Sequence, residues 1–176
     1  MTNQTYKEAK EKALGFYNKA NITLTAKERE NLEVADFGLN NLEKVGLQIV
    51  TYINTSRVCS KEMVLFPNQT CPEHKHPTIN SIPGKEETFR CRFGKVYLYV
   101  SGPETKDRAC QTPNEYYTVF KEVVLNPGEQ YTIYPDTFHW FQAGNKGAVI
   151  SEFSTASHDD TDIFTDPNIK RIPTIE

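Results

Sequence analysis

Two histidines, His74 and His76, stand in the segment CPEHKHP at a spacing that suits metal binding. On a β-strand, residues two positions apart point to the same face, so the two imidazoles would lie side by side. Glu87 follows eleven residues after His76, and a carboxylate from the next strand would add an oxygen ligand. This pattern calls for one more imidazole on a distant strand, and His139 in YPDTFHWF is the leading candidate. Nitrogen and oxygen ligands without thiolate suit Mn, Fe, Co, Ni or Zn.

Two glutamates, Glu87 and Glu152, stand at positions that alternation along a strand assigns to mostly apolar faces. The alternating positions are Lys85, Glu87, Phe89, Cys91 and Phe93 on one expected strand, and Ala148, Ile150, Glu152 and Ser154 on another. A buried carboxylate costs several kcal/mol unless it is paired or bound to a metal. Both glutamates therefore need a reason to point inward. The alternative interpretation is a surface His-x-His that has nothing to do with the other histidines.

The elements that hold these residues are helical at first and strand-like afterwards. Apolar residues at helical spacing, a capping box at Thr25–Glu28 and the apolar positions of 39–45 predict three helices before Gly46. From Leu47 the period changes to two, with strands expected at 47–54, 58–66, 85–93, 95–100, 117–125, 130–134, 139–142 and 148–155. Short strands at intervals of about ten residues, separated by Gly/Pro turns, favour a β-sandwich or barrel.

A chain of 176 residues is most simply one domain, 1–176. Within it we expect a helical N-terminal extension at 1–46, a barrel at 47–155 and a C-terminal segment at 156–176. Four apolar residues of that segment would anchor it on the barrel: Ile163, Phe164, Ile169 and Ile172.

Composition excludes several classes of function. A formal net charge of −3 and a pI near 5.9 give no basic surface for nucleic acid. The N-terminus lacks an apolar stretch and no run of about eighteen apolar residues occurs, so we expect a cytoplasmic protein without a membrane partner. The cysteines, Cys59, Cys71, Cys91 and Cys110, are then reduced thiols. A ligand role stays open for Cys71 and Cys91, which lie near the predicted metal site.

The metal-binding segments resemble the two sequence motifs of the cupins. The first is His74-x-His76, ten further residues, Glu87, six more and then Gly94, with a lengthened gap before the glutamate. The second is PDTFH, which ends at His139 after a Pro-Gly-Glu turn. It departs from the usual pattern, because its proline is one residue closer to the histidine and the expected glycine is missing. The resemblance implies a mainly β fold, a cupin-type antiparallel β-barrel (jelly-roll) with the N-terminal helices packed on the outside.

Within the cupins, the chain resembles the D-lyxose isomerase family in its short bacterial form. Four phrases carry this resemblance: ADFGL from Ala35, QTCPEHKHP from Gln69, GKEETFRCRFG from Gly84, and EFSTASHDDTDIFTDP from Glu152. They extend the similarity over most of the chain, and they are more specific than the cupin motifs, which host many functions.

The resemblance implies an enzyme that interconverts an aldose and its ketose, D-lyxose and D-xylulose, with D-mannose and D-fructose as a further pair. It implies a divalent metal, most often Mn²⁺, with Co²⁺, Ni²⁺, Fe²⁺ and Zn²⁺ as alternatives. It assigns ligand roles to His74, His76, Glu87 and His139 at the matching motif positions. Cupins often pair through sheet edges, so a homodimer is expected.

The chemistry of such a reaction asks for more than a metal. A proton must move between C1 and C2 through an enediol, and a carboxylate outside the metal ligands would carry it. We hypothesise that Glu152 is this base and that Lys85, on the same strand face as Glu87, stabilises negative oxygen or relays a hydroxyl proton. Asp162 and Arg171 are predicted to contact sugar hydroxyls. The alternative for Glu152 is a structural salt bridge to Lys85 or Arg171.

Two other functions fit the same residues. Three histidines and a glutamate also bind iron, so an iron-dependent cupin dioxygenase is one alternative. A non-catalytic sugar-binding cupin, in which metal and pocket only bind a ligand, is the other.

Overall fold

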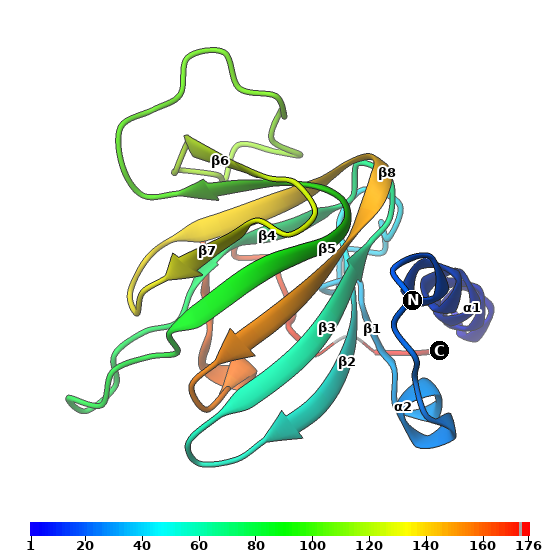
Figure 1. Cartoon of the computed structure of the whole chain (residues 1–176). Helices are drawn as coiled ribbons and strands as arrows, with labels where there is room; N and C mark the ends of the chain where they lie inside the picture. Colours follow the sequence, from blue (N-terminus) through cyan, green and yellow to red (C-terminus); the bar gives the residue numbers. More distant parts are fainter. Residues whose placement is uncertain (173) are drawn as a thin grey trace.

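The protein is described here by a computed structural model that covers residues 1–172 and 174–176. Residue 173, in the predicted C-terminal segment, lies outside the described residues. The elements are α1 (Asn3–Lys19), α2 (Ala26–Glu30), β1 (Glu33–Ala35), β2 (Leu47–Asn54), β3 (Cys59–Leu65), β4 (Thr70–Lys75), β5 (Glu87–Val100), β6 (Lys121–Leu125), β7 (Gln130–Ile133), β8 (His139–Ser154), a 3₁₀ turn (Asp159–Thr161) and β9 (Ile163–Phe164). The strands form one curled antiparallel sheet, with the helices outside it (Figure 1). This confirms the predicted mainly β fold class.

The long strands β5 and β8 form the spine of the barrel. They pair with each other along their whole length, from Glu87 opposite Ser154 to Val100 opposite His139. The other edge of β8 pairs with β3 along one half of the strand and with β4 along the other half. Both strands turn back on themselves in the middle (Figure 1). The two ends of the ribbon therefore come together at one end of the barrel.

Two glycines occupy the turn of this ribbon. Gly94 and Gly147 both have φ of +76°, a left-handed conformation that side chains disfavour. A Cβ on Gly94 would lie 1.9 Å from the carbonyl oxygen of Gly147, so the two backbones approach too closely for any side chain. Sequence reasoning placed a break between strands at Gly94, whereas the structure has one continuous strand with a bulge on each side of the glycine. The break was wrong because a bulged strand keeps its pairing on both sides of the irregularity.

The first bulge also reverses the face on which Phe93 lies. Phe89 and Cys91 belong to the barrel core, as alternation from Glu87 predicts. Phe93 instead packs with the helix, its ring centroid 6.2 Å from that of Phe16, because the register shifts between Cys91 and Phe93. The prediction that Phe93 shares the face of Glu87 was therefore wrong.

Replacing Gly94 with alanine should lower the free energy of unfolding by at least about 1–3 kcal/mol, the usual cost of a strained non-glycine conformation. The close approach of the Gly147 carbonyl oxygen adds a clash that only a backbone shift relieves. Gly15→Ala is the matched control, since nothing lies within 4 Å of its Cβ position in α1. That change should raise stability by about 0.5–1 kcal/mol. Denaturant unfolding of both variants measures the effects, and equal midpoints for the two would contradict the role of Gly94.

The N-terminal helix α1 covers the outside of the barrel. Its buried residues, Ala9, Ala13, Phe16 and Tyr17, recur at helical spacing and pack on outward-facing valines of the sheet. The capping box at the start of α2 is present, with Thr25 and Glu28 bonded reciprocally. None of the helices formed by residues 1–172 and 174–176 has the length and apolar content needed to span a membrane.

The third predicted helix, from Leu39 to Val45, does not form. These residues make turns, and Val45 forms a β-bridge with Thr70. Asn40, within this segment, has φ of +51°, a left-handed conformation that an α-helix does not allow. Leu39 and Val45 nevertheless pack on the barrel core. Their apolar spacing reflects that packing rather than a helix.

The C-terminal segment runs along the wall of the barrel. Its strand β9 pairs with β4, so that Phe164 lies opposite His74. Further along, the amide of Lys170 donates to the carbonyl oxygen of Phe37 at 2.8 Å. This segment therefore reaches both the metal-binding segment and the N-terminal half of the chain. The division at 46/47 and 155/156 stays a prediction.

Glu73, next to His74 on β4, anchors the long loop that precedes β6. It is 1% exposed, and its carboxylate accepts hydrogen bonds from the amide of Thr118 at 2.7 Å and the amide of Val119 at 3.1 Å. The Val119 carbonyl oxygen in turn accepts from the indole of Trp140 at 2.8 Å. Glu73 is therefore a structural carboxylate that supports β4 and the start of β8 from outside the cavity.

Candidate metal and active site

Three imidazoles meet at the end of the barrel where the β5–β8 ribbon closes. His74 lies on β4, His76 just after it, and His139 begins β8. Their ligand atoms all lie within 4.8 Å of one another, and all three residues are buried. His74 and His139 are cross-strand partners, with ring centroids 4.3 Å apart. The structure thus brings together the three histidines that sequence spacing selected.

Two of these rings are oriented by backbone carbonyl groups. Nδ1 of His74 is 2.8 Å from the carbonyl oxygen of Pro72, and Nδ1 of His139 is 2.9 Å from that of Thr137. A carbonyl oxygen can only accept, so Nδ1 carries the proton in both rings and the Nε2 lone pair is free. Hydrogen bonds of this kind are what orient histidines at metal centres.

Nε2 of His139 is a buried nitrogen that lacks a hydrogen bond. It lies 3.0 Å from Oε1 of Glu87, but it makes no hydrogen bond with that oxygen or with any other of the described residues. An unpartnered buried nitrogen costs about 1–3 kcal/mol. A metal ion accepts such a lone pair, so the residues present fit a divalent cation.

Burial lowers the pKa of His74 well below its ordinary value, and the neighbouring His139 and His76 lower it further. His74 is therefore neutral, the form in which imidazole binds metals. His76 behaves differently. Burial would lower its pKa, but the charge of Glu87 and the hydrogen bond to Asp162 raise it to about 9. Nδ1 of His76 is 2.5 Å from Oδ1 of Asp162, so this ring is oriented by a carboxylate.

Glu87 begins β5 and touches two of the three rings. Its Oε1 lies 3.0 Å from Nε2 of His139 and 3.2 Å from Nε2 of His76, and its Oε2 lies 2.7 Å from Nζ of Lys85. Burial alone would raise the pKa of Glu87, but the charges of Lys85 and His76 hold it well below its ordinary value. Glu87 is therefore an ionised carboxylate placed where it can share an ion with the imidazoles.

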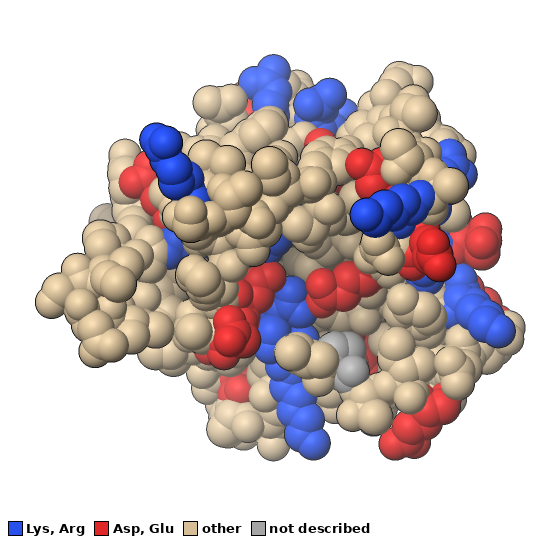
Figure 2. Space-filling model, turned by 90° about the horizontal axis from the view of Figure 1, so that it is seen from below, with Lys and Arg blue, Asp and Glu red and all other residues tan. Residues whose placement is uncertain are grey.

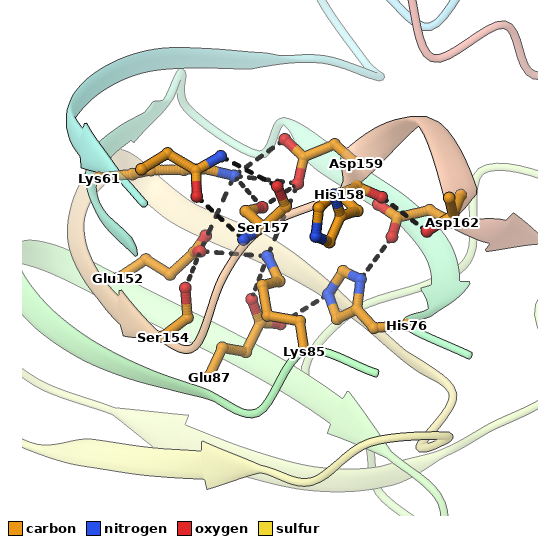
Figure 3. A network of polar contacts seen from close by, with 12 residues as sticks. Lys61, His76, Lys85, Glu87, Glu152, Ser154, Ser157, His158, Asp159 and Asp162 are labelled. Carbon is orange, nitrogen blue, oxygen red and sulfur yellow. Dashed lines mark hydrogen bonds and ion pairs between the residues drawn. The ribbon is translucent and has the colours of Figure 1, made fainter. Parts of the chain in front are cut away.

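A second carboxylate, Glu152, stands on the far side of Lys85 (Figure 3). Its Oε1 accepts hydrogen bonds from the ammonium of Lys85 at 3.1 Å and from the hydroxyl of Ser154 at 3.1 Å. The same oxygen lies 3.8 Å from Nζ of Lys61. Its Oε2 has no hydrogen bond with any of the described residues. One oxygen is thus anchored while the other stays available. Of the two structural salt bridges considered for Glu152, the one to Lys85 is present.

Burial would lower the pKa of Lys85, but Glu152, Glu87 and Asp159 hold it well above the ordinary value. Lys85 is therefore an ammonium group between two carboxylates. Arg171 is paired elsewhere, with Nη1 at 2.5 Å from Glu33 and Nη2 at 3.0 Å from Asp159.

These groups surround a small cavity of about 40 Å³ inside the barrel. Both polar and apolar side chains line it. The polar lining is Lys61, His74, His76, Lys85, Glu87, Glu152, Asp159, Asp162 and Arg171; the apolar lining includes Phe37, Leu47, Ile49, Met63 and Phe164. Asp162 and Arg171, both predicted as sugar contacts, therefore lie beside the predicted metal ligands.

A larger cleft of about 600 Å³ opens outside this cavity, between the loop after β4 and the segment after β8. The two spaces share His76, Lys85 and Asp162. Seen from below, the molecule has a hollow around which acidic and basic side chains gather (Figure 2). The cleft is a route from solvent to the metal-binding end of the barrel.

Sequence reasoning missed Lys61 and Asp159. Lys61 lies inward on β3, opposite Glu152, and its Nζ is 2.8 Å from Oδ2 of Asp159. Alternation along 59–65 would have placed Lys61 on the face of Met63, which is a core residue. Nothing in the acidic stretch around Asp159 distinguishes the one aspartate that turns inward.

The cysteines do not join the metal-binding group. All four are buried free thiols, and the group of metal-binding residues found in the described part of the chain contains the three histidines alone. Burial raises the pKa of Cys71 well above its ordinary value and that of Cys91 to about 11, so both thiols stay protonated at neutral pH. A protonated thiol is a poor metal ligand.

Comparison with known proteins identifies the family of this chain. The sequence model of the D-lyxose isomerase family matches residues 15–176. A D-lyxose/D-mannose isomerase from Thermosediminibacter oceani is 62% identical over 97% of this chain and 96% of its own length. A D-lyxose ketol-isomerase from a Thermofilum species is 56% identical over 99% of both chains.

The fold has relatives among solved structures. The crystal structure of an L-ribose isomerase from Acinetobacter, in complex with L-ribose, matches with a TM-score of 0.79 over 100% of this chain and 98% of the other. At 16% identity this likeness shows the shared fold alone, and it agrees with the predicted cupin-type barrel. The sequence matches go further. Because they extend over nearly the whole chain at more than half identity, the chain belongs to the D-lyxose isomerase family, as its motifs predicted.

Proposed function

We propose that this protein is a metal-dependent aldose–ketose isomerase that converts D-lyxose to D-xylulose and also D-mannose to D-fructose. One observation carries the proposal. His74, His76 and the ionised Glu87 line the same cavity as the Lys85–Glu152 pair, whose carboxylate keeps one oxygen available, and His139 lies 3.0 Å from Glu87. The names of the relatives support the choice of sugars.

The proposed ligands are His74, His76, Glu87 and His139, and the preferred metal is Mn²⁺, with Co²⁺, Ni²⁺, Fe²⁺ and Zn²⁺ as alternatives. A divalent ion bound there would polarise the sugar carbonyl and stabilise negative charge on its oxygens. The orienting contacts of the three Nδ1 atoms support this assignment, because they keep the Nε2 atoms turned toward one another.

Glu152 is the proposed base. Its free Oε2 removes the proton from C2 of the aldose, and the C2–H electron pair forms the C1–C2 double bond of an enediol. The carbonyl oxygen on C1 receives a proton and becomes a hydroxyl. The O2 hydroxyl then loses its proton as C2 becomes a carbonyl, and Glu152 returns its proton to C1. The ketose has the same atoms as the aldose, and Glu152 is regenerated.

Lys85 is the proposed relay between the two sugar oxygens. It gives a proton to O1 and takes one from O2, and its place between Glu87 and Glu152 supports this role. Asp162 and Arg171 are proposed to contact sugar hydroxyls, since both line the cavity. Each also has a partner in the protein, so each would position the sugar against a fixed part of the fold.

A homodimer completes the proposal, and it rests on the tendency of cupins to pair through sheet edges.

An assay with purified protein tests this function. The chelator-treated protein is reloaded with Mn²⁺, Co²⁺, Ni²⁺, Fe²⁺ or Zn²⁺ and given D-lyxose, D-mannose and other aldoses in D₂O. We expect ketose formation to be restored best by Mn²⁺, with solvent deuterium entering the product at C1. Failure of every metal to yield a ketose from either sugar would refute the proposal.

The same assay separates the two alternatives. Turnover with Mn²⁺ under strict anaerobiosis excludes an obligate oxygen requirement, and with it a dioxygenase. A non-catalytic sugar-binding protein would bind the aldose without any deuterium exchange.

A further inference from the structure

Lys61 is a buried lysine to which the proton-transfer scheme assigns no task. It lies on β3 directly opposite Glu152 on β8, and cross-strand partners share a face of the sheet. Only 5% of its surface is exposed, and its side chain lines the cavity. Burying an ammonium group costs several kcal/mol unless the group is paired. This lysine therefore needs compensating partners.

Those partners are supplied by the segment that follows β8. Nζ of Lys61 donates to Oγ of Ser157 at 2.9 Å and to the two carboxylate oxygens of Asp159 at 3.0 and 2.8 Å. It lies 3.8 Å from Oε1 of Glu152, close enough for an ion pair without a hydrogen bond. Figure 3 shows Lys61, Ser157 and Asp159 above Glu152 and Lys85 in that view.

The charged groups form a row in which positive and negative alternate. From the predicted metal ligand outward, the row is Glu87, Lys85, Glu152, Lys61, Asp159, Arg171 and Glu33. Neighbours in the row lie between 2.5 and 3.8 Å apart. Glu152 stands between the two lysines and shares its charge with both, and Asp159 also lies 3.9 Å from Nζ of Lys85.

Each lysine has a further carboxylate closer to it than Glu152. Lys85 is 2.7 Å from Oε2 of Glu87, and Lys61 is 2.8 Å from Oδ2 of Asp159. In the proposed reaction Glu152 becomes neutral when it takes the proton from the sugar. At that moment Lys85 is still paired with Glu87, and Lys61 is still paired with Asp159. No buried ammonium group is left without a counter-charge.

We propose, on the basis of the isomerase function proposed above, that Lys61 is a positioning residue for Glu152 and that Asp159 is its second partner. Lys61 does not touch the reacting carbon. It holds the Oε1 side of Glu152 together with Lys85 and Ser154, so that Oε2 faces the sugar. Asp159 keeps Lys61 in place while Glu152 changes its charge during each turnover.

Steady-state kinetics of Lys61→Met test this role, because methionine keeps the length of the side chain and removes the ammonium group. We expect kcat to fall about 10- to 100-fold, the usual consequence of a misplaced catalytic group. KM should stay within about twofold, and the metal content should equal that of the wild type. Lys61→Arg should recover most of kcat, since arginine can bind the same two carboxylates.

Lys95→Met is the matched control, a partly buried lysine on β5 whose ammonium lies 6.0 Å from the ring centre of Tyr97. Its kcat should equal that of the wild type. If Lys61→Met does not fold, the double variant Lys61→Met/Asp159→Asn decides, because it leaves neither member of that pair charged.

A kcat within about twofold of the wild type in the folded single or double variant, or a loss confined to KM, would overturn the proposal. Wild-type protein that isomerises no sugar refutes the proposed function itself. Active wild type with equally active Lys61→Met refutes only the role of Lys61.

Discussion

Replacement of Glu152 with glutamine should lower kcat for aldose–ketose conversion by about 10²- to 10⁴-fold, the contribution usual for a general base. Glutamine has the same shape but cannot accept the proton. Because Oε2 of Glu152 has no hydrogen bond with the described residues, the change leaves the neighbouring contacts largely in place. Metal analysis of the purified variant should give the wild-type content, since Glu152 is not among the proposed ligands. Loss of deuterium exchange at the sugar carbon should accompany the loss of turnover.

Glu86→Gln is the control for this experiment. Glu86 is exposed and lines only the outer cleft, one residue away from Glu87. Its replacement should leave kcat unchanged. Near-normal turnover by Glu152→Gln would instead favour the structural alternative, in which Glu152 only neutralises Lys85.

Replacement of His139 with alanine should abolish metal retention. Among the residues that the structure describes, the change removes the one ring nitrogen that is buried without a hydrogen bond, and with it a proposed ligand from the distant strand β8. Losing a partner that merely orients a ligand weakens metal binding about 10- to 100-fold, so loss of the ligand itself should exceed this. Competition with a chelator measures the affinity directly, without reference to turnover. Activity should fall in parallel and return in part only at high metal concentration.

His158→Ala is the control for this variant. His158 is exposed and is the fourth histidine of the chain, and it lies outside the group that meets at the barrel end. Its removal should leave metal affinity unchanged. Equal affinity of His139→Ala and wild-type protein would exclude His139 as a ligand.

Most of the predicted metal ligands could be selected from the sequence because their selection depends on short-range geometry. His74 and His76 follow from a period of two, and Glu87 from its inward position at the start of a strand. His139 needed chain order and a motif, since nothing local ties it to the other two. The structure brings all four together, with His139 and Glu87 at opposite ends of a paired ribbon.

The features that were predicted wrongly from the sequence depend on irregularities that leave no periodic signal. One extra residue in β5 moved Phe93 to the helix side, and the left-handed conformation of Asn40 interrupts the helix expected at 39–45. Lys61 and Asp159 escaped for a different reason. Lysines and aspartates are mostly exposed, and only three-dimensional pairing distinguishes the few that turn inward.

The pairing of β8 with strands far from it in sequence also affects the order in which the molecule folds. Strand pairs between residues distant in sequence, such as His74 with His139, require long loops to close before any contact rewards them. Chains dominated by such contacts fold slowly, and their non-local parts form late. A growing chain that has not yet completed β8 holds two imidazoles and Glu87 with nothing to gather them. The predicted metal site is therefore complete only when β8, the last long strand, has paired. Metal binding would then indicate that the chain has folded completely.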